Sequence, residues 1–399
     1  MAEMALHTDT LARRGEKTSE RRIIFALLAG NFIIGTGILL PVGMLTDLAE
    51  GLSISVPAAG SLMLASGVVV ALGAPLIAAF TSAIDRRLIL AVSLLLYVIG
   101  HAISAVVTSF PMLIAARTLI AIGAAIFTPQ AAATLGALIP PERRASAITL
   151  AFVGWSLATV AGMPMGGWLA HAYSWRVAFW VTAALSAIVL VAVWATVPKA
   201  VRIAPLNASS WRAVAKHPAL LLTLAITILN GCGQFTLLTY LNPSLKASLG
   251  ADTNTVALIL AWFGAWATTG NLAASRIVAG LGPGRVVTGT LMIIAVALAL
   301  WGFGAGTLPV VLLAAALWGF GTFSSNSVQQ ARLSAMAPEL ASASVALNTS
   351  AMYVGQGSAA ALGGALISNG HMPALPFAGA AIVLAATALS AFVLVRRKG

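Results

Sequence analysis

Two residues with charged or titratable side chains lie inside long apolar stretches of this sequence. Arg117 stands within the stretch 111–137, and His101 stands within the stretch 88–108. A charge is costly to hold in an apolar medium, so such residues are functional candidates by default. Arg117 would organise a polar cavity for a solute, and His101 would take up and release a proton, because histidine titrates near neutral pH.

Both residues also have structural interpretations. Arg117 could form a structural ion pair or extend its head group to the polar boundary, and His101 could hydrogen-bond a neighbouring helix without titrating. The two share a depth, since Arg117 lies roughly 9 Å and His101 roughly 10 Å from the same end of their stretches at about 1.5 Å per residue. Asp47 follows the first apolar stretch on that side, and it would pair with Arg117 if the two helices meet.

The acidic residues are placed differently from Arg117. All ten aspartates and glutamates fall in tails, loops or the ends of apolar stretches. An unpaired cation would find no partner at the middle of such stretches, and burying it there would be costly. A cavity built from this chain should therefore disfavour cations and accept neutral polar or anionic solutes.

Composition and run lengths define the elements that must position these residues. The chain is 60% hydrophobic and 8% charged, against about 25% charged residues in soluble domains. Its apolar runs are each about 20 residues long, as membrane-spanning helices require, and backbone in lipid must be helical or in a closed barrel. We predict an all-α polytopic membrane protein with twelve spans, at 23–44, 56–80, 88–108, 111–137, 146–170, 176–197, 218–241, 254–279, 286–305, 308–331, 342–368 and 374–395.

The distribution of basic residues predicts the topology. If twelve spans alternate in direction, 19 of the 22 lysines and arginines fall on one side of the membrane. The exceptions are Lys246, Arg176 and Arg117. By the positive-inside rule both termini are cytoplasmic, so the net charge of +12 indicates topology and not a nucleic-acid partner. We expect 1–22 to be an uncleaved cytoplasmic tail. The single cysteine, Cys232, cannot build a disulfide or a metal site.

An internal repeat divides the chain into two halves. Pro141-Glu142 and Gly166-Gly167 recur as Pro338-Glu339 and Gly363-Gly364, always 197 residues later. We predict an N-terminal six-helix half at 23–197, a cytoplasmic linker at 198–217 and a C-terminal six-helix half at 218–399. Paired halves of this kind hold solute between them near the midplane and rock against each other. The sequence contains no GxxxxGK[ST] phosphate-binding loop, which argues against ATP-driven pumping.

Several motifs occur in the order and spacing of one family. They are Asp85-Arg86-Arg87 after the second span, Arg117 with Gly123 in the fourth, Gly162-Met163-Pro164-Met165-Gly166-Gly167 in the fifth, and Asn242-Pro243 at the end of the seventh. Together they resemble the major facilitator superfamily, and in particular its twelve-span efflux branch, which includes arabinose, sugar, chloramphenicol and nucleoside exporters. The resemblance covers nearly the whole chain.

The resemblance also implies roles for residues. In this superfamily, spans 1, 2, 4, 5, 7, 8, 10 and 11 largely line the cavity, so the resemblance implies that polar residues in these spans contact the solute. Any one of them could instead only form hydrogen bonds between helices. The implied solute-binding residues are Asn31, Arg117, Gln130, Gln234, Tyr240, Asn242, Asn326, Gln330, Asn348 and Gln356. Proton coupling would involve His101, Arg117 and Asp47. Gating would involve the loop residues Ser82, Asp85, Arg86 and Arg87, although the charges of this loop could equally serve only the membrane topology. Gly162, Pro164, Gly166 and Gly167 would belong to the gate by allowing close helix approach.

One departure from the family pattern concerns proton coupling. Members of this branch usually carry a glutamate a few residues before a Pro-Val-Gly in the first span, and Ile38 stands at that place before Pro41-Val42-Gly43. We expect a monomeric inner-membrane exporter of a small neutral or weakly anionic solute, driven by proton antiport and needing no cofactor or metal. The alternative is an uncoupled facilitator. An enzyme would need a cluster of catalytic acids or histidines, which the sequence does not offer.

Overall fold

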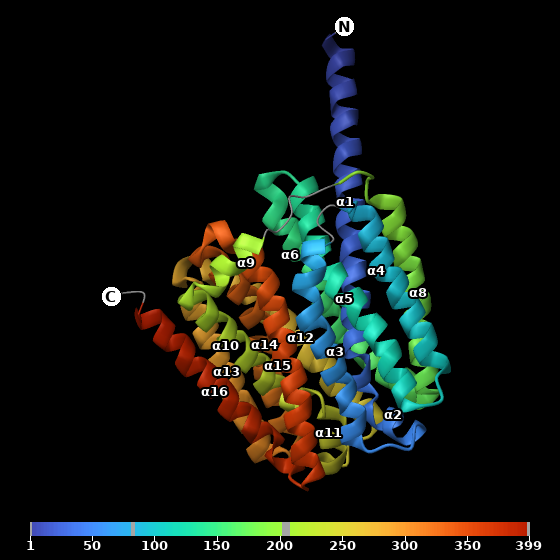
Figure 1. Cartoon of the computed structure of the whole chain (residues 1–399), viewed down its shortest axis with the longest axis vertical. Coiled ribbons are helices and arrows are strands. Elements are labelled where there is room, and N and C mark those ends of the chain that lie inside the picture. The colour runs from blue at the N-terminus through green and yellow to red at the C-terminus, as the bar shows by residue number, and fades with distance from the viewer. Residues whose placement is uncertain (1, 81–83, 202–207, 397–399) are drawn as a thin grey trace.

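The chain is almost entirely helical. The computed structural model describes residues 2–80, 84–201 and 208–396, which form helices joined by short turns (Figure 1). The first six spans correspond to α1 (Ala2–Gly43), α3 (Val56–Phe80), α4 (Arg86–Val106), α5 (Phe110–Leu138), α6 with η1 and α7 (Pro141–Ala172) and α8 (Trp175–Thr196). The remaining six correspond to α10 (Pro218–Leu238), α12 (Thr253–Leu281), α13 (Pro283–Gly304), α14 (Leu308–Met336), α15 (Ala341–Ser368) and α16 (Leu375–Arg396).

The helices match the predicted membrane spans. Within the described residues, eleven segments are long and apolar enough to cross a membrane. The remaining predicted span, the eleventh at 342–368, corresponds to α15, which is 28 residues long. The prediction of an all-α polytopic membrane protein is confirmed, because long apolar stretches in lipid can satisfy their backbone groups only within helices.

The long helices pack in two groups. In the first group α1 packs on α6 and α8, and α4 packs on α5 and α8. In the second, α14 packs on α12 and α13, and α16 packs on α10 and α13. The groups meet where α3 lies along α15 and where α7 and η1 lie along α12. Any site between the groups must therefore be built from helices of both.

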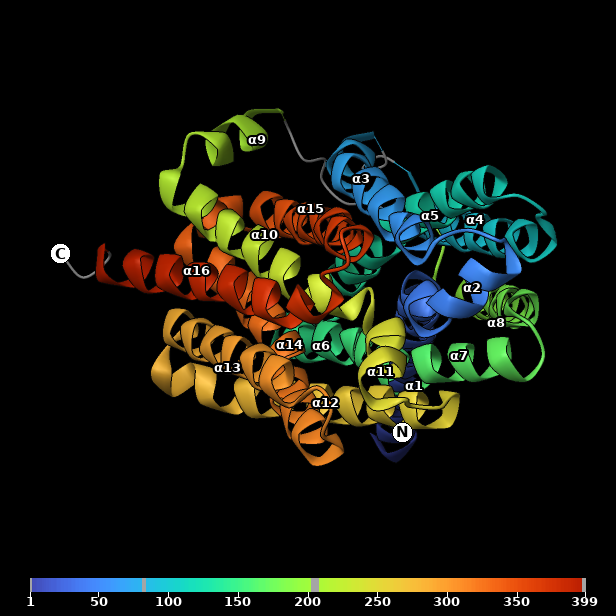
Figure 2. The same cartoon turned by 90° about the horizontal axis from the view of Figure 1, so that it is seen from below.

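Short helices mark the two faces of the molecule. The linker helix α9 (Ala208–Ala215) lies near the face from which the first turns of α1 project, which we call the terminal face (Figure 1). The short helices α2 (Leu45–Gly51) and α11 (Leu241–Leu249) lie at the opposite, far face (Figures 1 and 2). They follow α1 and α10 respectively, and their first residues, Leu45 and Leu241, are 196 residues apart, within one residue of the repeat offset. The repeat in the sequence thus reappears as matching elements.

Two departures from regular helix shape the interior. Span 5 is interrupted by a π-helical turn, η1 (Ala158–Gly162), between α6 (Pro141–Leu157) and α7 (Met163–Ala172). Pro41 lies inside α1, where a proline has no N–H to give to the carbonyl four residues earlier. Single π-helical turns and proline breaks free backbone groups, and they occur often at functional sites.

Candidate functional site

A cavity of about 1050 Å³, including its open mouth, lies between the two groups of helices. On α14 its walls come from 322–330, in the half of that helix nearer the terminal face. On the far side of the cavity the groups touch directly, since a Cβ on Gly264 would lie 2.7 Å from Val160 and a Cβ on Gly60 would lie 2.3 Å from the Tyr240 hydroxyl. The cavity therefore extends from the middle of the protein toward the terminal face.

The cavity walls carry no charged group. Of the described residues that line it, none is an Asp, Glu, Lys, Arg or His. Amide and hydroxyl side chains alternate with aromatic ones, so a bound solute would meet apolar surface and a few hydrogen-bonding groups. The lining residues are Leu39, Thr128, Phe152, Trp155, Ser156, Thr159, Met163, Phe235, Leu238, Phe263, Asn271, Thr322, Phe323, Asn326, Ser327, Gln330, Thr349, Met352, Tyr353 and Gln356.

Three of the predicted solute-binding residues line this cavity. They are Asn326, Gln330 and Gln356, from α14 and α15. Asn348 stands one layer behind, where its amide donates to Asn326 Oδ1 at 3.2 Å and accepts from Thr227 Oγ1 at 2.7 Å. The amide of Asn326 is thereby held in place from behind.

Gln234 supports the same wall without lining it. Its Oε1 accepts from Thr322 Oγ1 at 2.7 Å and from Trp318 Nε1 at 3.0 Å, and its Nε2 donates to Asn230 Oδ1 at 2.8 Å. With both ends of the amide engaged, Gln234 fixes the Thr322 hydroxyl at the cavity surface. Buried networks that are fully bonded in this way hold one arrangement of the surrounding side chains.

The other predicted solute-binding residues lie outside the cavity lining in this conformation. Asn31 donates to the Ala151 carbonyl at 3.1 Å and Gln130 accepts from Arg86, both inside the first group of helices. Tyr240 donates to the Ala360 carbonyl at 2.7 Å, and Asn242 donates to the Gly43 carbonyl at 2.8 Å. Their contact with solute stays a prediction.

Arg117 is fully buried in the first group of helices. Its Nη1 donates to the Gly37 carbonyl at 2.6 Å, its Nη2 to the Ile38 carbonyl at 3.0 Å, and its Nε to Ser66 Oγ at 3.3 Å. Gly37 is four residues before Pro41, so its carbonyl lacks the usual helical donor. Where the family pattern places a carboxylate, this chain offers backbone carbonyls to the guanidinium.

His101 lies against the same turn of α1. Its side chain is fully buried, and neither ring nitrogen has a hydrogen-bond partner among the described residues. The ring is enclosed by Tyr97, at 4.9 Å between centroids, and by Phe179, at 5.8 Å. A Cβ on Gly37 would lie 2.3 Å from His101 Nε2, so only a glycine fits at that position. Arg117 and His101 therefore contact one residue, Gly37, from two directions.

Tyr353 connects this buried pair to the cavity. It belongs to α15 of the second group, lines the cavity, and is 7% exposed among apolar residues of the first group. Tyr353 therefore touches both the cavity and the apolar interior of the first group.

Asp47 is not paired with Arg117, contrary to the sequence-based expectation. Its carboxylate lies on α2, 3.8 Å from Nδ1 of His171 at the end of α7. Burial raises the pKa of Asp47 above its usual 3.8, although the nearby positive charges of Lys246 and His171 act in the opposite direction. Lying toward the same side of the membrane did not suffice for pairing, because Arg117 points toward α1 and α3 instead of the far face.

The predicted gating loop joins the first group to the linker. Asp85 accepts from the backbone N–H of Arg87 at 2.9 Å and from that of Ala200 at 2.6 Å, which caps α4 and attaches the linker. The Arg86 side chain donates to Gln130, and Arg87 stacks over Trp194 at 4.2 Å. Ser82 lies outside the described residues. A gating role for these residues stays a prediction.

The predicted glycines lie on the face of span 5 that meets α1. A Cβ on Gly162 would lie 2.0 Å from Thr36 Oγ1, one on Gly166 2.2 Å from Leu40, and one on Gly167 2.6 Å from the Gly43 carbonyl. Pro164 is buried in the first turn of α7, directly after the π-helical turn, where it has no N–H to donate to the preceding turn. Small residues therefore let span 5 and α1 approach closely.

Sequence reasoning missed most of the apolar lining. Phe152, Trp155, Phe263 and Tyr353 line the cavity, yet in sequence they look like other aromatic residues of apolar helices. The sequence signal that could have found Trp155 is its position directly after Gly154 in the glycine-rich fifth span.

The comparisons with known proteins agree with this geometry. The sequence model of the Major Facilitator Superfamily matches residues 27–244, more than half of the chain. The chain is 30% identical over 347 residues to the inner membrane transport protein YdhP of Escherichia coli K12, covering 87% of this chain and 89% of YdhP. This chain belongs to the Major Facilitator Superfamily, and it is a multi-pass membrane protein that transports small molecules, not an enzyme.

Two further similarities bear on the branch and the fold. A chloramphenicol resistance protein of Streptomyces lividans is 30% identical over 260 residues, covering 64% of this chain and 66% of that protein. The crystal structure of a D-xylose-proton symporter superposes with a TM-score of 0.76 at 16% identity, covering 92% and 96% of the two chains. The predicted family is confirmed, and a probable sugar efflux transporter of Mannheimia succiniciproducens is also among the relatives.

Proposed function

We propose that this protein exports a small neutral or weakly anionic solute across the cytoplasmic membrane by alternating access. The observation that carries the proposal is the uncharged lining of the cavity between the two groups of helices. A permanent cation there would have no carboxylate to offset its lost hydration, whereas sugars, nucleosides and amphenicols can use amide and hydroxyl groups. The similarity to efflux proteins supports the direction of transport.

The orientation follows from the basic residues. The terminal face is the cytoplasmic one by the positive-inside rule, so the cavity is open toward the cytoplasm and closed toward the outside. A solute would enter from the cytoplasm and leave after the two six-helix halves rock. We propose that the halves, residues 23–197 and 218–399, are the moving units and that 198–217 links them.

We propose further that transport is coupled to protons through His101. Its two ring nitrogens have no partner among the described residues, and both His101 and Arg117 contact Gly37, so a proton taken up on His101 would change the charge beside Arg117. Asp47 would contribute from the far face through its pairing with His171. Because Ile38 stands where the resemblance to the efflux branch leads us to expect an acid, an uncoupled facilitator is the second candidate.

Flux in proteoliposomes decides between the two candidates. Uptake of radiolabelled chloramphenicol, uridine and xylose is measured with and without an imposed pH gradient. Antiport predicts flux that follows the gradient, and His101→Gln should retain exchange of solute but lose that dependence. His371→Gln, an exposed histidine on the far face, is the matched control. If the solute flux of the wild type does not depend on the pH gradient, the protein is an uncoupled facilitator instead.

A further inference from the structure

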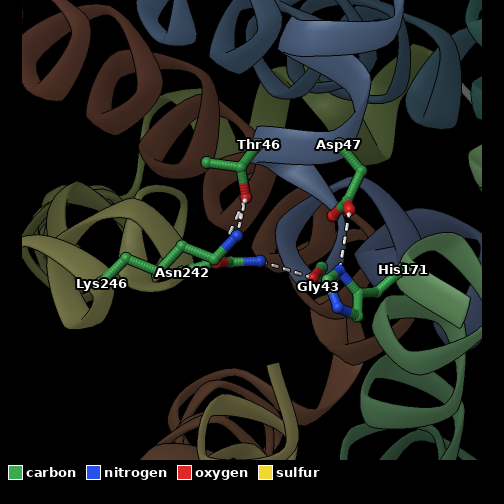
Figure 3. A network of polar contacts seen from close by, with 6 residues as sticks. All are labelled: Gly43, Thr46, Asp47, His171, Asn242 and Lys246. Atoms are coloured by element: carbon green, nitrogen blue, oxygen red, sulfur yellow. Dashed lines mark hydrogen bonds and ion pairs between the residues drawn. The ribbon is translucent and has the colours of Figure 1, made fainter. Parts of the chain in front are cut away.

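The two short helices at the far face carry a set of polar contacts that the cavity does not explain. Asn242 and Lys246 lie on α11 of the second group, and Thr46 lies on α2 of the first (Figure 3). Thr46 Oγ1 donates to Asn242 Oδ1 at 3.3 Å and accepts from Lys246 Nζ at 3.2 Å. With the bond from Asn242 to the Gly43 carbonyl, these residues form what we call the far-face network.

The bond to Gly43 satisfies a carbonyl that α1 leaves open. Gly43 is the last residue of α1, and the carbonyls of a final helical turn have no donor within their own helix. Asn242 Nδ2 reaches this oxygen at 2.8 Å, and the Asn242 side chain is 3% exposed. The orientation of the amide is defined, since turning it over would set its oxygen against the Gly43 carbonyl.

Each end of this bond is anchored in its own half. A Cβ on Gly43 would lie 2.6 Å from the Met163 carbonyl, so the end of α1 is packed directly on α7. On the other side, Tyr240 precedes α11 and donates to the Ala360 carbonyl of α15. The Asn242–Gly43 bond therefore joins two units that are each internally fixed, and it cannot survive their separation at this face.

Opposite charges face each other across the same boundary. Asp47 on α2 is acted on by the positive charge of Lys246 on α11. Its other charged neighbours are His171, at 3.8 Å, and Glu50, which is exposed on α2. Attraction between Asp47 and Lys246 adds to the hydrogen bonds that hold the face closed.

We propose that Asn242 is a gating residue, which holds the far face closed by donating to Gly43 and must release that carbonyl each time the face opens. The inference rests on the alternating access proposed above. Both partners can bond to water once the face opens, so the bond biases the equilibrium without locking it. Thr46 and Lys246 extend this contact. The Thr46 hydroxyl accepts from Lys246 and donates to Asn242 Oδ1, the oxygen of the amide whose nitrogen binds Gly43.

Distances between spin labels test this directly. In a Cys232→Ala background, Thr108→Cys and Thr307→Cys place labels at exposed positions on the far face of the first and second groups. Double electron–electron resonance in nanodiscs then measures the ratio of long to short distances without any solute. Asn242→Leu keeps the size of the side chain but removes the donor, and it should raise that ratio about tenfold, the effect of a buried hydrogen bond near the top of the usual range.

The control variant carries the same chemistry within one half. Asn369, also at the far face, donates to the Ala365 carbonyl of its own helix at 2.8 Å, so Asn369→Leu should leave the ratio unchanged. If Asn242→Leu fails to fold, Thr46→Val decides, because it removes the bridging hydroxyl and should shift the ratio in the same direction. A ratio equal to that of the wild type in the folded variant overturns the proposal. Since no solute is used, that result would leave the proposed substrate class and coupling untouched.

Discussion

Arg117 donates to the carbonyl oxygen of Gly37, the carbonyl that Pro41 leaves without a helical donor. A buried cation is thus stabilised by backbone dipoles. Its hydrogen-bond partners among the described residues are two backbone carbonyls and the Ser66 hydroxyl, with no carboxylate. Arg117 lies outside the cavity, whose own lining is uncharged. Three predictions test this site and the far face, and a fourth tests the cavity.

Replacing Arg117 should destabilise the fold. Arg117→Met leaves the Gly37 carbonyl buried and unbonded, which should cost about 1–3 kcal/mol of unfolding free energy. Arg117→Lys should recover only part of this, since an ammonium cannot reproduce the fork that contacts two carbonyls and Ser66. Thermal unfolding in detergent measures both variants. A methionine variant as stable as the wild type would mean that the three contacts contribute nothing.

Gly37→Ala should disturb the buried pair more than a glycine substitution elsewhere. The new methyl group would lie 2.3 Å from His101 Nε2, so the ring must move or α1 must shift. We expect a loss of stability of about 1–3 kcal/mol, as for other overpacked interiors. Gly289→Ala, where a Cβ meets no atom within 4 Å, is the control and should be neutral or slightly stabilising. Equal melting temperatures for the two variants would argue against the tight contact.

Asp47→Asn should raise stability at neutral pH. Burial raises the pKa of Asp47 in the folded protein above 3.8, so the ionised form is penalised by folding. That penalty is absent below both pKa values and appears as the pH rises through them. The melting temperature of the variant should therefore exceed that of the wild type at pH 7, and the difference should shrink as the pH falls toward 3.8. A variant that is less stable at pH 7 would show that the attraction of Lys246 and His171 outweighs burial.

A negative charge placed in the cavity should change its selectivity. Gln330→Glu puts a carboxylate on the wall that now carries amides, and ethidium should then bind about tenfold more tightly, a gain of about 1.4 kcal/mol. Asn369→Asp, at an exposed position outside the cavity, is the control for added charge. Fluorescence titration of the purified variants measures the affinity. Unchanged ethidium affinity in Gln330→Glu would contradict the claim that solutes bind in the cavity beside Gln330.

The spans could be predicted from sequence because the bilayer imposes one rule on every segment. Apolar length and charged ends located α3, α5 and α12 to within a few residues. The partners of Arg117 could not be predicted in the same way, because two of them are backbone carbonyls that no side-chain pattern reveals. The sequence placed Asp47 and Arg117 toward the same side of the membrane, but it did not reveal in which direction the Arg117 side chain points. The predicted pair of Arg117 with Asp47 was therefore wrong.

Polar residues in the spans were equally ambiguous. Asn326 and Asn242 have the same amide and similar apolar surroundings in sequence, yet one lines the cavity and the other joins the two groups at the far face. What separates them is the helix that each one faces, and this depends on how the two halves meet. Only the three-dimensional arrangement supplies that information.

The most direct test of the central claim is a stabilisation screen of the purified protein. Melting temperatures are measured with xylose, uridine, chloramphenicol and thiamphenicol, and with the cations ethidium and tetraphenylphosphonium. An uncharged cavity predicts that at least one neutral compound raises the melting temperature in a dose-dependent way, that Gln330→Leu abolishes the shift, and that neither cation has an effect. Stabilisation by the cations alone, unaffected by Gln330→Leu, would contradict the account.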